Sequence, residues 1–435
     1  HRRRHSFPTR RSSDLVMQKL LGFTLPTLFL SALSSSAFAT TGYFMHGYGV
    51  KAQGAAGASI AAFNDALIIA NNPSGLAWLD SRVDIGATIF NPKRSGEIEG
   101  NLAGANGQYS GNGREYFVLP EFAVNKKVND TVALGLAIYG NGGMNTSYKK
   151  NPYAAFGNTG EAGVDLAQIF ISPSVAWRYS ENQSIGVATN ILYQRFEAKG
   201  ISGFAPFSVD GQKLSNNGKD SATGIGVKVG WSAKLNDVVT VGANYSSKIK
   251  SDKFDQYRGL FAQAGGFDVP ESYGVGAAFQ LTPALTVLTD IARINYSDVD
   301  SVGNPFSLAS VMAGNGFGSE KGQGFGWKDI NVYKIGAAYQ VNPQVTIRAG
   351  YSHNDQPIPQ DQTFLNILAP GVIQDHLSVG ATWNIDRAQE LSVAYTYGLK
   401  ETVKGSQSIP LNFGGGEANL EMDQHILGVS YGLKF

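Results

Sequence analysis

The chain has 435 residues, a formal net charge of +1 and no cysteine. The absence of cysteine excludes a disulfide framework, and the near-balance of charge excludes the basic footprint of a nucleic-acid-binding protein. Its 53 glycines, 19 tyrosines and 24 phenylalanines favour a large β structure with aromatic belts over a helical one.

The first 39 residues read as processing segments. Residues 1–16, "HRRRHSFPTRRSSDLV", lack hydrophobic periodicity and are crowded with arginine, so we interpret them as a non-native leader and expect a natural start at Met17. A genuine long basic leader is the alternative. Residues 17–39 carry the three parts of a secretory signal peptide, namely Lys19, an apolar stretch and the small-residue cleavage site "AFA". Beyond them, 29 basic and 33 acidic residues remain, a net charge of −4.

Residues 40–80 are rich in small side chains and contain "GAAGASIAAFNDALIIA" followed by "NNPSGLAWL". Pro73 lacks an amide hydrogen and fixes φ, so it ends the preceding helical run, while an asparagine such as Asn72 can satisfy a turn locally. Glycine, alanine and serine permit close approach to neighbouring strands. We therefore predict that this segment fills the interior of a larger β structure.

From residue 81 onward, apolar and polar residues alternate with a period of two. In "TGIGVKVGWSAKL", Ile225, Val227, Val229 and Trp231 share one face, and glycine, serine and lysine occupy the other. Fourteen strands are predicted in this way: 82–92, 115–126, 131–140, 166–180, 183–198, 221–236, 237–249, 270–281, 284–298, 328–341, 343–354, 373–386, 389–402 and 421–435.

The connections between these strands alternate in length. Turns such as "KVND" and "LTPA" are tight, whereas 93–114, 141–165, 199–220, 250–269, 299–327, 355–372 and 403–420 are long. Short turns at one end, long loops at the other and an even strand number are typical of a bacterial outer-membrane barrel, which leaves no backbone group unpaired in lipid. Phe435 ends an alternating strand, a feature that resembles the sorting signal of such barrels and implies the barrel assembly machinery as a partner. The predicted fold is all-β: a transmembrane antiparallel β-barrel of about 14 strands over residues 81–435, with a small helical hatch over residues 40–80 plugging the lumen.

The segment "GYGVKAQGAAGASIAAFNDALIIANNPSGLAWL" resembles the opening of the FadL/TodX family of outer-membrane transporters. The resemblance rests on the Gly/Ala-rich stretch, on Asp65 and on the hatch motif Asn72, Pro73, Ser74 and Gly75. It implies a plugged barrel that takes up long-chain fatty acids or related hydrophobic compounds. It also implies capture at apolar extracellular loops, transfer to a site near the hatch, and lateral release beside a kinked third strand.

Two sets of residues follow from this reading. The third strand ends in Gly140, Gly142 and Gly143, which in the family would mark the kink, although an ordinary strand-to-loop turn is an equal alternative.

The long loops are unusually aromatic for exposed connections, and contiguous exposed apolar surface marks binding sites. The expected ligand-binding loop residues are Phe204, Phe207, Phe254, Tyr257, Leu260, Phe261 and Phe267; packing of loop against loop into a cap is the alternative.

Lumen-facing cations could bind a carboxylate. The alternation along each strand places Lys228, Lys334, Arg348 and Lys400 inside, but barrel interiors also carry charges that brace a plug, and a neutral ligand needs no cation.

Other functions remain as rivals. They are a general diffusion porin or a surface adhesin on the same barrel, and an outer-membrane lipase using His353. The four scattered histidines beyond the leader show no metal-ligand spacing, so we expect no metal, no cofactor and no enzymatic activity. The expected partners are hydrophobic small molecules, outer-membrane lipid and lipopolysaccharide, with no nucleic acid, and the expected state is a monomer in the bacterial outer membrane.

Overall fold

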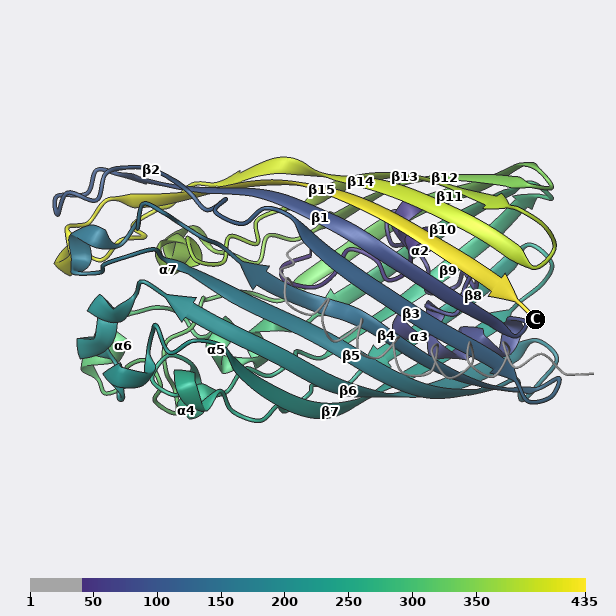
Figure 1. Cartoon of the computed structure of the whole chain (residues 1–435), viewed down its shortest axis with the longest axis horizontal. Helices are drawn as coiled ribbons and strands as arrows, with labels where there is room; N and C mark the ends of the chain where they lie inside the picture. The colour runs from purple at the N-terminus through teal and green to yellow at the C-terminus, as the bar shows by residue number, and fades with distance from the viewer. Residues whose placement is uncertain (1–40) are drawn as a thin grey trace, which may run out of the picture. The chain divides into compact units, whose positions relative to one another are not determined.

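The computed structural model describes residues 41–435, so the predicted leader and signal peptide lie outside the described residues. Fourteen strands pair antiparallel with their sequence neighbours, and β15 closes on β1 with the register Arg82↔Lys434 to Glu99↔Glu417 (Figure 1). The wall strands are β1 (Arg82–Glu99), β3 (Phe117–Lys127), β4 (Val132–Asn145), β5 (Gly163–Trp177), β6 (Gln183–Lys199), β7 (Asp220–Lys234), β8 (Val239–Ser246), β9 (Ser272–Thr282), β10 (Leu285–Ile294), β11 (Ile330–Asn342), β12 (Val345–Asn354), β13 (Asp375–Asn384), β14 (Gln389–Val403) and β15 (Glu417–Lys434).

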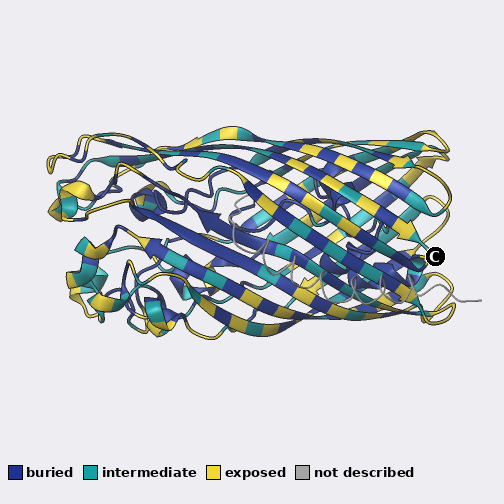
Figure 2. Cartoon of the chain, viewed as in Figure 1, coloured by how far each residue is buried: buried dark blue, intermediate teal, exposed yellow. Residues whose placement is uncertain are grey.

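The predicted closed barrel of fourteen strands is confirmed. Its alternating exposure appears as bands along each strand (Figure 2). In β7, Ile225 and Val227 are exposed on the outer face, whereas Gly226 and Lys228 are buried on the inner one. Because successive side chains of a strand point to opposite faces, this alternation sorts apolar groups toward lipid and small or polar groups toward the lumen.

The first strand is longer than its sequence pattern predicted. β1 runs to Glu99, and the expected loop 93–114 also contains β2 (Gly107–Ser110), which pairs only with the end of β1 and adds no strand to the wall. Arg94 in this region is only 3% exposed. In residues 91–99, apolar side chains no longer occupy every second position. The sequence pattern that marks a lipid-facing strand is lost here, although the backbone remains extended.

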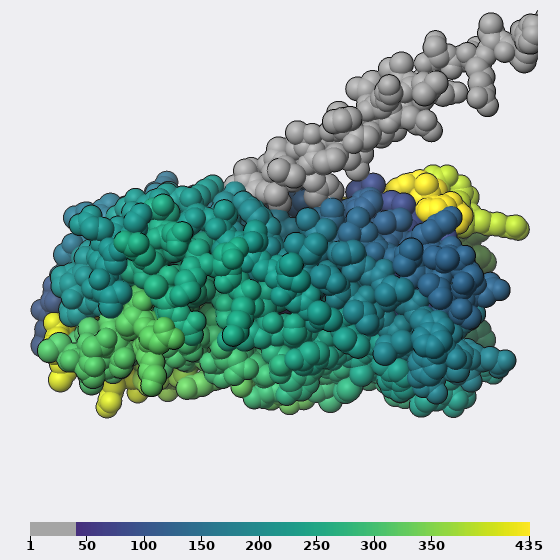
Figure 3. Space-filling model, turned by 90° about the horizontal axis from the view of Figure 1, so that it is seen from below, coloured from purple at the N-terminus to yellow at the C-terminus, as the bar shows by residue number. Residues whose placement is uncertain are grey.

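The two ends of the barrel differ as predicted. Tight turns join the strands at the end where the C-terminus lies, and long loops with short helices lie at the other (Figure 1). The loop helices are η2 (Ala154–Phe156), η3 (Ser202–Phe207), η4 (Gly211–Lys213), η5 (Asp255–Tyr257), α4 (Ala262–Gly265), η6 (Tyr296–Asp298), α5 (Asp300–Gly303), α6 (Leu308–Met312), η7 (Gln360–Gln362), α7 (Thr363–Asn366) and η8 (Leu411–Phe413). No helix within residues 41–435 is long and apolar enough to cross a membrane. In the space-filling view, the teal and green part of the chain covers most of the loop end of this face, and the blue part covers much of the turn end (Figure 3).

The N-terminal segment, residues 41–81, packs against lumen-facing groups of the wall. It contains α2 (Val50–Gly54), α3 (Ile68–Asn71) and the 3₁₀ helix η1 (Pro73–Trp78). A side-chain carbon added at Gly54 would lie 3.1 Å from the Cα of Gly380 in β13, so two backbones approach closely here. The small residues of this segment therefore allow its backbone to pack closely against the wall, as predicted from the sequence.

Candidate functional site

A buried charge network fastens the N-terminal segment to the wall. Glu390 on β14 accepts hydrogen bonds from Lys51 of α2 and from Arg82 of β1, and both Lys51 and Glu390 are at most 6% exposed. Arg82 also forms a bidentate pair with Asp84, at 2.6 and 2.8 Å, and Asp84 in turn accepts the amide of Ala66 at 2.8 Å. Buried charges are tolerated when they are paired in this way, and the pairing fixes where the segment sits.

The hatch motif forms a second anchor, on β6 and β7. Asn72 donates its side-chain amide to the carbonyls of Ile60 (2.8 Å) and Trp231 (3.0 Å) and accepts from the hydroxyl of Ser74 (2.7 Å). Pro73 is the first residue of η1, where a missing amide hydrogen costs nothing. Gly75 is tightly enclosed, since an added side-chain carbon would lie 2.5 Å from Ile68. The motif therefore holds the bend between the segment and the wall.

The wall is incompletely paired between β3 and β4. Their ladder runs only from Phe122↔Ile138 to Lys127↔Ala133, and neither residues 117–121 of β3 nor residues 139–145 of β4 continue it. Pro120 has no amide hydrogen to donate, and the β4–β5 register shifts between Gly140 and Gly142, where Asn141 is the extra residue. We call this unpaired stretch the wall gap; a small cavity of ≈ 10 Å³ lies beside it.

Residues 41–45, here called the strap, lie along the inner edge of β4 at this height. The amide of Met45 donates to the carbonyl of Asn141 (3.0 Å), and the amide of Gly143 donates to the carbonyl of Tyr43 (2.9 Å). A side-chain carbon at Gly142 would lie 2.0 Å from that Tyr43 carbonyl, so only glycine permits this approach. The predicted glycine cluster thus coincides with a bulge, and the strap covers it from within.

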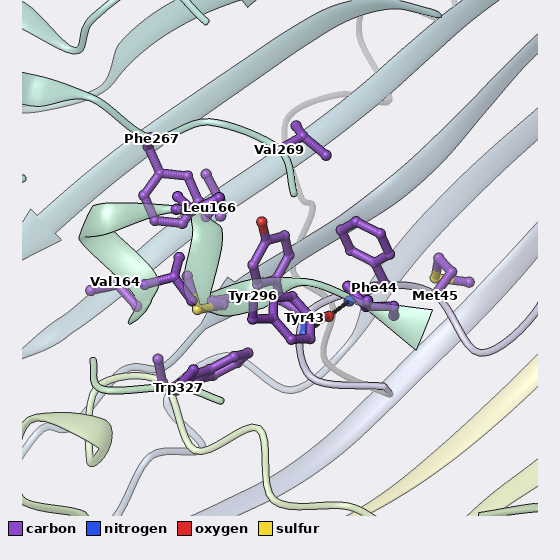
Figure 4. Close-up of a cluster of buried hydrophobic side chains, with 14 of the residues drawn as sticks. Tyr43, Phe44, Met45, Val164, Leu166, Phe267, Val269, Tyr296 and Trp327 are labelled. Atoms are coloured by element: carbon purple, nitrogen blue, oxygen red, sulfur yellow. Dashed lines mark hydrogen bonds between the residues drawn. The ribbon is translucent and has the colours of Figure 1, made fainter. Parts of the chain in front are cut away.

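An aromatic cluster holds the strap from the loop side (Figure 4). The hydroxyl of Tyr296, in the loop between β10 and β11, accepts from the amides of Tyr43 (3.2 Å) and Phe44 (3.3 Å) and donates to the carbonyl of Thr41. Burial raises the pKa of Tyr296 well above its usual value, so this hydroxyl keeps the proton that it donates. The ring of Trp327 packs against both Tyr43 and Tyr296, at 6.0 and 5.2 Å between centroids.

Two cavities lie inside the barrel and its loops. The outer pocket, ≈ 30 Å³, lies among the long loops and the adjoining ends of β5 and β6, and its lining is almost entirely apolar. The inner cavity, ≈ 100 Å³, lies in the lumen beside the strap and is lined by both polar and apolar groups. Its polar lining includes Asn141, Asn190, Lys228, Asn244, Ser246, Asp290 and Lys334. Its apolar lining includes Phe44, Phe170, Ile249 and Val332.

The predicted loop residues divide into two groups. Phe204, Leu260 and Phe261 line the outer pocket, whereas Phe207 is not part of that lining and packs against Phe413, at 5.6 Å between ring centroids. Phe254, Tyr257 and Phe267 are fully buried behind the pocket and pack around Phe261 and Phe196. Leu365 and Leu368, which belong to the apolar residues of the long loop 355–372, also line the pocket. Sequence reasoning missed Phe325, which lines the pocket from another long loop; only its apolar character within that loop could have signalled it.

The lysine and arginine residues predicted to face the lumen lie in different surroundings. Lys228 and Lys334 line the inner cavity, whereas Arg348 lies away from it and donates to the hydroxyl of Thr382 at 2.7 Å. The inward prediction for Lys400 is wrong: its side chain is exposed and pairs with Glu421, because the register of β14 with β15 shifts between Gly398 and Glu401. Lys334 donates to the carbonyls of His46 (3.0 Å) and Gly57 (3.4 Å) in the N-terminal segment. His353, the residue of the enzyme alternative, faces outward, pairs with Asp375 at 2.8 Å and is not part of the lining of either cavity.

A closed barrel with lipid-facing apolar bands and a plugged lumen defines an outer-membrane protein. Residues 30–435 match the family model described as outer membrane protein transport protein (OMPP1/FadL/TodX), and the chain belongs to that family. It is 26% identical to the long-chain fatty acid transport protein of Salmonella typhi, over 71% of this chain and 74% of that protein. The fold is similar to that of a solved Pseudomonas aeruginosa FadL homologue, with a TM-score of 0.70 and 16% sequence identity over 91% of this chain and 100% of that one. It is also similar to the Pseudomonas putida toluene transporter TodX, with a TM-score of 0.65 and 17% sequence identity over 90% of this chain and 99% of that one.

Proposed function

We propose that this protein is an uptake channel for long-chain fatty acids or related hydrophobic compounds across the bacterial outer membrane. The outer pocket captures the ligand, the inner cavity receives it near the N-terminal segment, and the wall gap releases it sideways into the bilayer. The names of similar proteins, a long-chain fatty acid transport protein and a toluene transporter, agree with hydrophobic cargo. The observation that carries the proposal is the wall gap, because a pore for polar solutes has no use for an opening toward lipid.

Capture at the loops has a physical basis. Apolar molecules gain about 25 cal/mol for each Å² that leaves water, and the outer pocket offers a lining with hardly any polar surface. Aromatic rings continue outward from it, since Phe413 packs against Phe204 (5.7 Å) and Phe207 (5.6 Å) between centroids and is itself half-buried. These rings give a hydrophobic compound a continuous surface from the loop tips to the pocket.

Lateral release can be tested by removing the bulge. Deletion of Asn141 would bring Gly140 and Gly142 into successive register with Ile169 and Gln168 of β5 and straighten β4. We expect this variant to lose most uptake of radiolabelled oleate in cells that lack their own transporter of this family. The matched control is Asn141→Ala, which keeps the bulge and removes only side-chain bonds to Tyr48 and Gln168. A folded deletion variant that transports at the wild-type rate would contradict the lateral route.

The rival functions have their own tests. A diffusion porin would show a large, steady aqueous conductance in planar bilayers, whereas the anchored N-terminal segment leads us to expect none. For the enzyme alternative, we expect no lipid hydrolysis with or without His353→Ala. We further propose that the protein works as a monomer, contacts lipopolysaccharide through its outer face, and is recognised by the barrel assembly machinery through Phe435, which is 63% exposed.

A further inference from the structure

We propose that Arg94 is a positioning residue that fixes the loop end of the wall gap and thereby limits how wide a hydrophobic compound can leave through it. This inference rests on the proposed uptake function and adds a residue that sets its size selectivity. Arg94 is singled out by its hydrogen bonds, its burial and its place in the wall.

The two ends of the wall gap are built differently. At the turn end, the continuous β3–β4 ladder closes the gap. At the loop end, residues 111–116, here called the crossing segment, lie between β1 and the chain that follows β4. There Ser147 accepts a hydrogen bond from the amide of Gly113 (2.9 Å) and donates its own amide to the carbonyl of Gly111 (3.0 Å). The loop end is therefore held by a short contact between irregular segments and not by a ladder.

Arg94 joins both margins of this loop end. Its guanidinium group donates to the carbonyl of Asn145, the last residue of β4, and to the carbonyl of Arg114 in the crossing segment. Its backbone holds the same segment to β1, because its amide donates to the side chain of Asn112 (2.7 Å) and its carbonyl accepts the amide of Gly111 (2.9 Å). One residue of β1 thus spans the crossing segment and reaches β4 on the far side of the gap.

The charge of Arg94 is buried without a carboxylate partner. The residue is 3% exposed, the face of the Phe117 ring lies 5.8 Å from its guanidinium carbon, and it forms no ion pair within residues 41–435. Glu115, an acid of the crossing segment, pairs with Lys93 instead. A charge buried in this way is costly, so packing alone would favour a neutral side chain here. A guanidinium group is a planar fork with five donors, which suits it to hold two carbonyls at once.

The geometry of the gap makes its loop end the place where its width is set. Residues 139–144 of β4 span roughly 20 Å at about 3.3 Å per residue, so the gap is long enough for an alkyl chain or a fused ring system. Its width then decides which of them passes. The turn end cannot widen without breaking the β3–β4 ladder, whereas the loop end can part once its few bonds are lost. By bonding both margins there, Arg94 keeps the gap narrow and favours slender cargo.

The test compares a slender cargo with a bulky one that carries the same head group. Uptake of hexadecanoate and of 16-(1-pyrenyl)hexadecanoate is measured in cells that lack their own transporter of this family and carry the full-length wild type, Arg94→Met or Arg94→Lys. Lys93→Met is the matched control, because Lys93 is the next residue of β1 and its ion pair reaches the crossing segment but not β4. Heat-modified migration on gels confirms that each barrel is folded.

We expect Arg94→Met to raise the ratio of pyrenyl-hexadecanoate uptake to hexadecanoate uptake at least fivefold. Arg94→Lys should raise this ratio less, since an ammonium group can keep one of the two carbonyl bonds, and Lys93→Met should leave it at the wild-type value. In purified Arg94→Met, amide hydrogen exchange at Gly113 and Ser147 should become faster, while exchange in the β3–β4 ladder stays the same.

An unchanged uptake ratio, unchanged exchange at these two amides, or an equal loss of both uptakes in a folded Arg94→Met barrel would overturn the inference and leave the uptake function standing. Failure of the wild type to take up hexadecanoate, oleate or toluene would instead refute the proposed function itself.

Discussion

The charge network around Glu390 leads to a prediction about what keeps the lumen closed. In Glu390→Gln, Lys51 loses the one carboxylate with which it pairs among residues 41–435 and keeps the carbonyl of Asn64 at 3.0 Å as an acceptor, while Arg82 keeps Asp84. Breaking a buried ion pair by removing one partner costs about 3–5 kcal/mol, because the other charge stays buried. We take about 3 kcal/mol, since the remaining carbonyl and the Arg82–Asp84 pair limit the loss.

This cost falls on the docking of the N-terminal segment, because the β1–β15 and β13–β14 ladders do not depend on Glu390. Every 1.4 kcal/mol changes a population tenfold, so undocked states should become about 100-fold more frequent. In planar bilayers, we expect Glu390→Gln to show channel openings about two orders of magnitude more often than the wild type, with unchanged heat-modified migration of the barrel.

Two controls make the prediction specific. Glu421→Gln is the same substitution in an outward pair with Lys400, whose side chains are 40% and 57% exposed, and such surface pairs contribute at most about 1 kcal/mol. The double variant Lys51→Met with Glu390→Gln should close again in large part, because the orphaned charge is gone. A folded Glu390→Gln barrel as silent as the wild type would refute the idea that this network holds the segment in place.

Three further predictions concern the strap and the N-terminal segment. Tyr296→Phe removes the hydroxyl that accepts hydrogen bonds from two strap amides. The rate of amide hydrogen exchange at residues 43 and 44 should therefore rise at least tenfold, while exchange in the β-ladders stays the same. An unchanged rate would show that ring packing alone holds the strap. Gly142→Val would place a side-chain carbon 2.0 Å from the carbonyl oxygen of Tyr43, so the strap should be displaced and become accessible to protease. Resistance of the strap to protease in the folded variant would contradict this prediction. Burial, reinforced by Asp84, raises the pKa of Asp65 to about 6, so its protonated form is favoured in the folded state and stability should increase as the pH falls from 7 to 5. In Asp65→Asn that gain should become smaller in thermal unfolding at the two pH values; an equal gain in the variant would assign it to other groups.

Much of the fold could be read from the sequence because a membrane barrel is specified locally. Each strand must present apolar residues to lipid at every second position, so residues such as Ile225 and Val227 reveal a strand without any knowledge of its neighbours. The limits of strands were harder to predict. β1 continues past residue 92 to Glu99, and β2 forms within an expected loop, because there the two faces meet loops or lumen groups and alternation no longer marks them.

The site was only partly predictable, for the same physical reason. Parity along one strand placed Lys228 inside the barrel, but whether a carboxylate compensates it depends on side chains from other strands and from the N-terminal segment. Likewise, the aromatic character of Phe204 and Phe254 is the same in the sequence, yet the first lines the outer pocket and the second is packed behind it.

The sequence by itself determined the strand periodicity, the alternation of short turns and long loops, and the motif Asn72–Gly75, since each is a local property of the chain. Only the tertiary structure decided that β3 and β4 part above Phe122, that the strap lies across this opening under the hydroxyl of Tyr296, and that Lys228 faces a cavity without a countercharge. These features arise from contacts between residues as far as 255 positions apart, which no local pattern encodes.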